Sequence, residues 1–206
     1  MIELYDFPRC PFCRKVRITL QEKGIKYKNI LVDLNNKEQK KPQFLKLNPS
    51  GKVPVLVDGT KIIYESTIIN EYLEEKFENP PLLPKNIYKK AKIRMLVEYC
   101  EKTFHTHVFS IYKELKLKKT LKINKKLIEH DKTRLDAELK YLNDLLKGSN
   151  YLAGRFSLAD IAFMPRVLIL QYLDIGINSK YKFVLGWVEN LKKRDSSKII
   201  LEGNDR

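Results

Sequence analysis

Two cysteines with the spacing of a reactive thiol motif lie near the start of the chain, in the sequence Cys-Pro-Phe-Cys at residues 10–13. An apolar run typical of a β-strand precedes them, and a helical pattern begins at Pro11. A sulfur at a helix start lies near unpaired backbone N–H groups and the positive end of the helix dipole, and both favour a thiolate. Arg9 and Arg14 add positive charge nearby. The stretch therefore predicts a nucleophilic thiol at Cys10.

The composition narrows the class of protein. Three cysteines in 206 residues do not make a disulfide framework, and the cysteine pair lacks the second Cys or His pair of a zinc site, so we expect no metal. No run is apolar enough to span a membrane, and no basic segment followed by an apolar one opens the chain. The net charge is +15, but no nucleic-acid-binding motif accompanies it. We therefore expect a cytoplasmic protein with no membrane and no nucleic-acid partner.

Alternating and helical patterns predict a first domain over residues 1–77 that positions the cysteines. A strand, a helix and a strand in succession make a parallel βαβ unit, and Asp58-Gly59 predicts a hairpin between two later strands. Ser66 is expected to cap the last helix, which turns Ile68, Ile69, Tyr72 and Leu73 inward. The layout is that of thioredoxin, with strands over 2–6, 27–32, 53–57 and 61–64 and helices over 11–24, 37–47 (short and irregular) and 66–77.

A proline-rich break over residues 78–85 predicts a linker, and residues 86–206 read as a second, all-helical domain. Ser157 and Asp160 have the spacing of a capping box at the start of one of its helices, and Pro165 should bend that helix. The polar end of the chain, 195–206, is expected to be loosely held. The predicted helices cover 86–118, 124–147, 158–172 and 183–194.

Four motifs, in order along almost the whole chain, resemble those of the glutathione S-transferase superfamily. The cysteine motif is most similar to that of the cysteine-type branch, which is omega-like or dehydroascorbate-reductase-like. The resemblance implies an α/β thioredoxin-like N-terminal domain followed by an all-α C-terminal helical domain. Besides residues 10–13, the motifs are Asn48-Pro49-x-Gly51-x-Val53-Pro54-Val55-Leu56, Tyr64-Glu65-Ser66-x-x-Ile69-x-x-Tyr72-Leu73 and Leu152-x-Gly154-x-x-Ser157-x-Ala159-Asp160.

The same resemblance implies how glutathione is bound as co-substrate. Pro54 is expected to follow a cis peptide bond, which leaves the backbone of Val53 free to pair with the cysteinyl part of glutathione. Ser66, at a helix start, would meet the γ-glutamyl carboxylate, and Glu65 the γ-glutamyl ammonium group. Phe12 is also expected among the glutathione-binding residues.

A lysine is expected to bind the glycyl carboxylate of glutathione. Lys40 matches by its spacing the lysine of omega-like members, and Lys41 and Lys52 are rivals.

The resemblance further implies a glutathione transferase that acts as a thiol transferase or as a reductase. The reductase would act on disulfides or would be of the dehydroascorbate type. In that reading Cys10 attacks a small-molecule or protein disulfide, and glutathione resolves the product. Cys13 is an alternative, resolving thiol, although one turn into the helix it should face inward and be less reactive. Tyr5 lies near the hydroxyl of tyrosine-type enzymes, but we expect it to pack at the end of the sheet. A homodimer is expected.

Three other functions stay open at this point. One is a conventional transferase that conjugates glutathione to an electrophile. Another is a non-enzymatic regulator resembling stringent starvation protein A, which binds RNA polymerase. The last is a relative of the membrane-inserting chloride-channel-like proteins, for which the sequence has no membrane-spanning segment.

Overall fold

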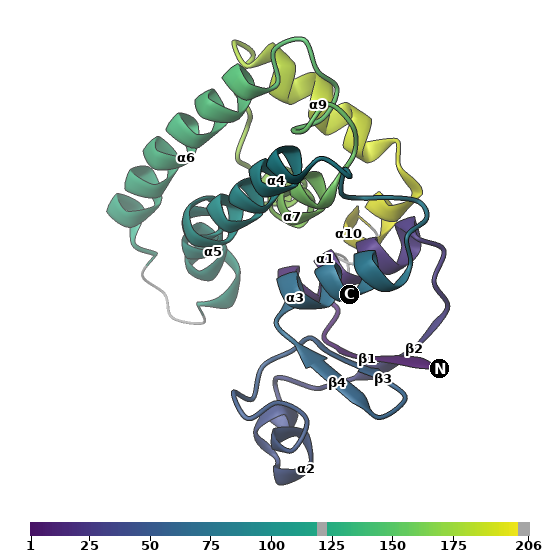
Figure 1. The fold of residues 1–206 in the computed structure, drawn as a ribbon. Coiled ribbons are helices and arrows are strands. Elements are labelled where there is room, and N and C mark those ends of the chain that lie inside the picture. Colours follow the sequence, from purple (N-terminus) through teal and green to yellow (C-terminus); the bar gives the residue numbers. More distant parts are fainter. Residues whose placement is uncertain (119–122, 202–206) are drawn as a thin grey trace. The chain divides into compact units, whose positions relative to one another are not determined.

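The structure, a computed structural model, describes residues 1–118 and 123–201 (Figure 1). The chain divides into two compact units. The first comprises Met1–Leu82 together with Lys198–Arg206, and the second comprises Leu83–Ser197. The predicted linker, 78–85, contains the boundary between Leu82 and Leu83. None of the described helices is both long enough and apolar enough to cross a bilayer.

The first unit is built on a four-stranded sheet in the order β2-β1-β3-β4. As the βαβ pattern predicts, β1 (Ile2–Asp6) runs parallel to β2 (Tyr27–Leu31). It runs antiparallel to β3 (Val55–Asp58), which forms a hairpin with β4 (Lys61–Tyr64). The thioredoxin-like layout is therefore confirmed.

Helices cover both faces of this sheet (Figure 1). On one face, α1 (Pro11–Glu22) and α3 (Ser66–Lys76) enclose a core that includes Leu4, Leu20 and Leu73. On the other, α2 (Pro42–Leu45) brings Phe44 against Val55. Two faces can be buried because successive strand residues point to opposite sides of a sheet.

One local prediction for this unit is refined by the structure, and another is wrong. The irregular helix expected over 37–47 is a 3-10 turn, Glu38–Lys40, followed by α2, because Pro42 forces Lys41 into an extended conformation. Ile68 was expected to face inward but is 56% exposed, since the buried stripe of α3 runs through Ile69 and Leu73 instead.

The segment that follows α3 is held in place by two buried charges. Lys23 Nζ lies 2.5 Å from Glu74 Oε2 and donates to the carbonyl oxygens of Phe77 and Pro80, at 2.7 and 3.0 Å. Glu74 in turn accepts from the backbone N–H of Leu82, at 3.0 Å. The first part of the predicted linker is thus bonded to the first unit.

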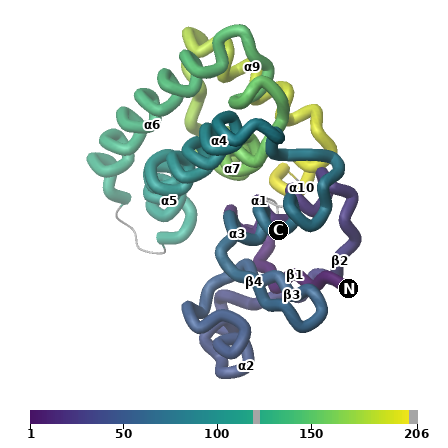
Figure 2. The backbone as a smooth tube through the Cα atoms, in the orientation of Figure 1, coloured from purple at the N-terminus to yellow at the C-terminus, as the bar shows by residue number. Residues whose placement is uncertain are grey.

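In the second unit the backbone is helical from Ile87 to Leu117 (Figure 2). Within this stretch, α4 (Ile87–Tyr99) and α5 (His105–Tyr112) are each followed by a π turn, Cys100–Phe104 and Lys113–Leu117. The other helices of this unit are α6 (Lys125–Leu145), α7 (Leu158–Val167), α8 (Ile169–Tyr172) and α9 (Lys182–Lys192). All four predicted helices of the second domain are therefore present, with the third divided into α7 and α8 after Pro165.

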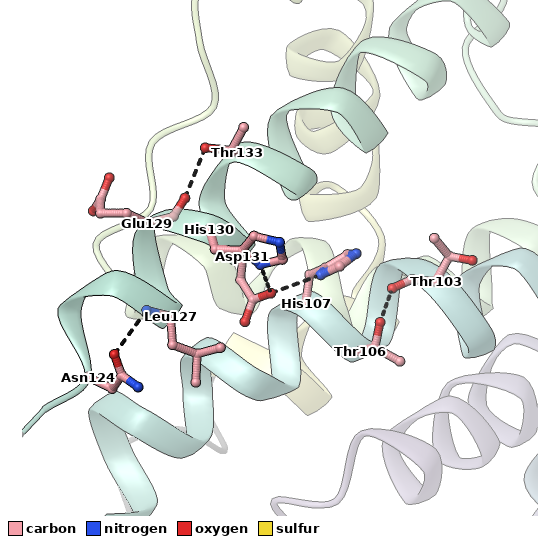
Figure 3. A network of polar contacts seen from close by, with 9 residues as sticks. All are labelled: Thr103, Thr106, His107, Asn124, Leu127, Glu129, His130, Asp131 and Thr133. Carbon is pink, nitrogen blue, oxygen red and sulfur yellow. Dashed lines mark hydrogen bonds and ion pairs between the residues drawn. The ribbon is translucent and has the colours of Figure 1, made fainter.

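A buried carboxylate joins α5 to α6 (Figure 3). Asp131 Oδ1 lies 3.2 Å from His107 Nδ1 and 3.3 Å from Nδ1 of its neighbour His130. Burial opposes the charge of Asp131, but hydrogen bonds from Ser110, His107 and His130 outweigh it and lower the pKa of that carboxyl group.

The capping box is present as predicted, and both of its residues are fully buried. Asp160 Oδ2 accepts from the backbone N–H and the hydroxyl of Ser157, both at 3.0 Å. Its Oδ1 accepts from the backbone N–H of Leu152 at 3.0 Å and from the indole of Trp187 at 2.9 Å. One carboxylate thus joins the start of α7 to the preceding loop and to α9.

The end of the chain is more ordered than its polar sequence suggests. Residues 195–201, expected to be loosely held, form a 3-10 turn and α10 (Lys198–Leu201), while 202–206 lie outside the described residues. Ile200 is fully buried, and α10 contacts α1. The first unit therefore includes α10, whereas the sequence assigned residues 86–206 as a whole to the second domain.

Candidate thiol site

The register of the sheet brings the predicted site segments together. Tyr5 of β1 pairs with Val55 of β3, so the loop that leads from β1 to Cys10 begins beside Pro54. Val55 also pairs with Tyr64, which places Glu65 across from Pro54. Three segments that are distant in sequence therefore meet at one end of the sheet, where β1 and β4 end and β3 begins.

Cys10 occupies the N-cap position of α1. Its backbone N–H donates to the Phe7 carbonyl oxygen at 3.0 Å, and its carbonyl oxygen accepts the first helical hydrogen bond from Arg14 at 2.9 Å. The side chain of Cys10 is half-buried, whereas Cys13, one turn into the helix, has no exposed surface. Both thiols are free. The site therefore has one partly exposed cysteine and one fully buried cysteine.

The two thiols differ in acidity for reasons that the geometry explains. The Cys13 thiol donates to the sulfur of Cys10, and the backbone N–H groups of Cys13 and Phe12 also donate to it. Together they lower the pKa of Cys10, against the opposing effects of burial and of the Asp6 charge. Burial, followed by this hydrogen bond and the charge of Cys10, raises the pKa of Cys13 well above its ordinary value. Cys10 is therefore the more acidic thiol of the pair, and Cys13 is its hydrogen-bond donor.

The arginines near the cysteines contact the backbone of the loop. Arg14 Nε and Arg17 Nη2 both donate to the Pro8 carbonyl oxygen, at 3.1 and 2.6 Å, and Arg14 is almost fully buried. Hydrogen bonding is the leading cause of the lowered pKa of Cys10, and the expected effect of the Arg9 and Arg14 charges stays a prediction.

Asp6, a buried acid at the end of β1, was missed in the sequence. It lies 3.4 Å from Arg17 Nε, and its charge raises the pKa of Cys10 and of Cys13. The sequence holds a signal for it, because alternation along β1 puts Asp6 on the same face as the core residues Ile2 and Leu4.

The segment before β3 has the backbone geometry that the resemblance implies. The peptide bond between Val53 and Pro54 is cis. Pro54 is buried and Val53 is half-buried, and both precede the first paired residue of the strand, Val55. The backbone of Val53 is thus outside the ladder of β3.

Glu65 and Ser66 form the start of α3. Glu65 is exposed and has a φ of 68°, a conformation that is uncommon for a residue with a side chain. Ser66 is the first helical residue and is buried. The buried Lys15 of α1 donates to the Thr67 hydroxyl at 2.9 Å, which sequence reasoning also missed. This helix start therefore combines backbone donors with a nearby ammonium group.

The three rival lysines have different surroundings. Lys40 Nζ donates to the Ser50 carbonyl oxygen at 3.2 Å and lies where a side chain at Gly51 would be, 2.7 Å from the Cβ position. Lys41 is paired with Glu38 at 3.1 Å, and Lys52 is exposed. Lys40 is thus the lysine that is held against the loop leading to Val53.

Tyr5 packs at the end of the sheet, as expected. Its ring meets that of Phe44 edge-on, with centroids 6.3 Å apart. Across the ranges 1–118 and 123–201, no three His, Cys, Asp or Glu side chains are grouped so that they could hold a metal ion.

Comparison with known proteins gives two family matches that together cover most of the chain. The glutathione S-transferase N-terminal domain matches residues 4–81, and the C-terminal domain of the same family matches residues 99–195. The boundary of the first match lies one residue from that of the first structural unit.

Relatives of similar length carry the same family name. Glutathione S-transferase F10 of Arabidopsis thaliana is 30% identical over 197 residues, which cover 91% of this chain and 90% of that protein. Glutathione S-transferase D6 of Drosophila melanogaster is 28% identical over 98% of both chains. A serine-to-cysteine mutant of poplar glutathione transferase F1 is similar in structure, with a TM-score of 0.87 and 29% identity over 98% of this chain and 97% of that one. These relatives belong to plant and insect subgroups, so the omega-like subgroup stays a prediction.

Proposed function

The chain belongs to the glutathione S-transferase family, and we propose that it is a glutathione-dependent thiol transferase with Cys10 as its nucleophile. The observation that carries the proposal is the half-buried Cys10 sulfur, whose pKa is lowered by donors from Cys13 and from the start of α1. A serine or tyrosine hydroxyl can stabilise a glutathione thiolate, but a cysteine thiolate can itself form a covalent bond with sulfur.

The proposed reaction exchanges one disulfide for another. The Cys10 thiolate attacks the glutathione sulfur of a mixed disulfide, a Cys10–glutathione disulfide forms, and the other thiol leaves as a thiolate that takes up a proton. A second glutathione thiolate then attacks the bound glutathione sulfur. Oxidised glutathione leaves and the Cys10 thiolate returns, so the net reaction consumes one free glutathione, whose sulfur replaces the substrate sulfur in the disulfide.

Glutathione would lie at the end of the sheet where the three segments meet. In this proposal the backbone of Val53 pairs with its cysteinyl part, which brings the glutathione sulfur to Cys10 and Phe12. Ser66 and the free N–H groups of α3 receive the γ-glutamyl carboxylate, because a helix start favours an anion. Glu65 meets the ammonium group.

Lys40 completes the proposed glutathione site by binding the glycyl carboxylate. Its position against the Ser50–Gly51 loop supports this role, since that loop leads directly to Val53.

A conventional transferase is the second candidate, and the names of the relatives favour it. In that case Cys10 would hold glutathione as a thiolate by hydrogen bonding, and glutathione itself would attack an electrophile. A Cys10→Ser variant distinguishes the two functions, because a hydroxyl can still donate to a thiolate but cannot form the mixed disulfide.

Turnover of a glutathionylated peptide and of an aryl halide, each by the wild type and by Cys10→Ser, tests this choice. We expect the variant to lose disulfide exchange by at least about a hundredfold, as for removal of a nucleophile. If the variant retained full disulfide exchange, the thiol-transferase proposal would be overturned. If the wild type conjugated the halide but exchanged no disulfide, the second function would replace the first.

A homodimer is also proposed, on the basis of apolar surface in the first unit. Ile62 and Tyr64 of β4 and Ile68 of α3 are exposed, although isoleucine is usually buried. β4 is an edge strand of the sheet, and contact with a second copy would cover these side chains.

A further inference from the structure

The second unit carries an exposed patch that combines lysines with apolar side chains, at the end where α5 and α6 meet. Leu117 is 50% exposed, Ile123 is 46% exposed, and Leu127, on the first turn of α6, is 36% exposed. We define this patch, the helix-pair tip, by Lys116, Leu117, Ile123, Lys125, Lys126 and Leu127.

The two sides of the tip are bonded together through one carboxylate. Glu114 Oε2 accepts from the backbone N–H of Asn124 at 3.0 Å and from Lys118 Nζ at 2.9 Å. Asn124 in turn caps α6, because its Oδ1 accepts from the backbone N–H of Leu127 at 3.1 Å (Figure 3). The lysines and leucines of the tip are therefore held close together.

The positive charge of the tip is not neutralised within the part of the chain that the structure describes. None of Lys116, Lys125 and Lys126 has a carboxylate within ion-pair distance there, while Glu114 is already paired with Lys118. Lys116 instead lies over the ring of Tyr172 of α8, 4.3 Å from its centroid. Three lysines without a carboxylate partner there and three exposed apolar side chains thus lie on the two segments that Glu114 joins.

We propose that the helix-pair tip binds the surface of anionic membranes. Lysines are attracted to anionic headgroups, and apolar side chains between them can enter the boundary between headgroups and acyl chains. A nucleic acid would be bound by the lysines, but it offers nothing to Leu117, Ile123 and Leu127. A membrane surface that is anionic outside and apolar beneath complements both the lysines and the apolar side chains of the patch.

This proposal departs from the expectation of no membrane partner. The sequence shows the density of lysines, but it does not show which leucines and isoleucines remain exposed among them. The attachment would be peripheral, since no described helix could cross the bilayer.

Flotation with lipid vesicles tests the proposal on the full chain. Vesicles of phosphatidylcholine alone are compared with vesicles that also contain phosphatidylglycerol, at low and at high salt. We expect the protein to float with the anionic vesicles only, and high salt to release it. Binding that was equal on both kinds of vesicle, or absent from the anionic ones, would overturn the proposal.

Two sets of variants identify the surface. Substituting Gln for Lys116, Lys125 and Lys126 should weaken partitioning by about fivefold per lysine, or roughly a hundredfold in all. The matched control makes the same change in charge at exposed lysines outside the tip: Lys89, Lys182 and Lys193. The proposal fails if the two triple variants bind alike.

A double substitution of apolar residues tests whether the tip binds a lipid surface or another polyanion. Leu117→Asn with Leu127→Asn should weaken vesicle binding at unchanged charge, with Met95→Asn, at an exposed position of α4, as its control. A single-stranded RNA oligonucleotide serves as the competing probe. If the lysine variant lost RNA binding while the leucine variant left vesicle binding intact, the tip would be a nucleic-acid surface and the membrane proposal would be wrong.

Discussion

At the scale of single residues, the site consists of two cysteines with different tasks. Cys13 is fully buried and its pKa is raised, which keeps it protonated, and a protonated thiol can donate to Cys10. As the fourth residue of the motif it sits at the capping-box position of α1, three residues after the N-cap. The structure therefore favours a donor role for Cys13 over that of a resolving thiol.

Replacement of Cys13 tests this donor role. Cys13→Ala removes a hydrogen bond that lowers the pKa of Cys10, so that pKa should rise. Alkylation of Cys10 by iodoacetamide near neutral pH should slow by about tenfold, because a hydrogen bond to a charged group is worth about 1.5–3 kcal/mol.

Cys13→Ser is the matched control, since its hydroxyl can still donate to Cys10. The rate is followed by mass spectrometry of the Cys10 peptide over a range of pH. If both variants had the pH profile of the wild type, Cys13 would have no part in activating Cys10.

Asp160 provides a prediction about pH and stability in the second unit. Burial is the largest influence on this carboxyl group, and it raises the pKa to about 6 from an ordinary value of 3.8, against the hydrogen bonds of Leu152, Trp187 and Ser157. A raised pKa means that the folded chain binds the proton more tightly than the unfolded chain. The contribution of this proton to the free energy of unfolding is fully present below about pH 4. It is lost as the pH rises through about 6, and it amounts to up to about 3 kcal/mol.

Denaturant unfolding of the wild type and of Asp160→Asn, from pH 4 to 7, measures this effect. The variant should be less stable by about 2–3 kcal/mol near pH 4, because its amide leaves a buried donor without an acceptor. The difference between the two proteins should shrink as the pH rises. A constant difference across this range would show that Asp160 does not titrate there.

At the scale of elements, the Lys23–Glu74 pair determines how α1, α3 and the following segment are joined. Lys23→Met would leave Glu74 charged and buried, and we expect it to reduce the free energy of unfolding by about 3–5 kcal/mol. Lys26→Met, at an exposed position, is the control and should change stability by less than about 0.5 kcal/mol.

Limited proteolysis gives a second readout of the same contact. Cleavage near Phe77–Leu82 should be faster in Lys23→Met, because the carbonyl oxygens of Phe77 and Pro80 lose their common donor. Equal cleavage in the variant and the control would mean that the pair does not hold this segment.

Much of the order and position of the strands and helices was predictable from the sequence. Alternation gave the four strands, Asp58-Gly59 gave the hairpin, and Ser157 with Asp160 gave the start of α7. The errors came where burial depends on distant contacts. A polar sequence concealed α10, whose Ile200 is buried through packing in the first unit, and Ile68 was placed inward although its helix buries a narrower stripe.

The residues of the candidate site were likewise predicted only in part. The glutathione-binding positions were inferred from motifs, because motifs describe local backbone. Asp6 and Lys15 were missed, since their importance arises from burial beside Cys10 and beside the start of α3. The sequence signal that could have identified both is a charged residue at an inward-facing position of a strand or helix.

At the scale of the whole molecule, the dimer proposal leads to a direct prediction. Ile68→Glu places a charge on the exposed apolar surface of α3 and should shift a dimer toward monomer without unfolding the chain. Light scattering coupled to size-exclusion chromatography reports the mass, with Met95→Glu of α4 as a control at another exposed apolar residue. A wild type that is monomeric at every concentration would contradict the proposal.

The most direct test of the central claim is a peptide map of the wild-type protein after treatment with oxidised glutathione. We expect a single glutathione adduct on Cys10, with Cys13 and Cys100 unmodified because both are buried. An unmodified Cys10, or an adduct on Cys13 in its place, would contradict the assignment of Cys10 as the nucleophile.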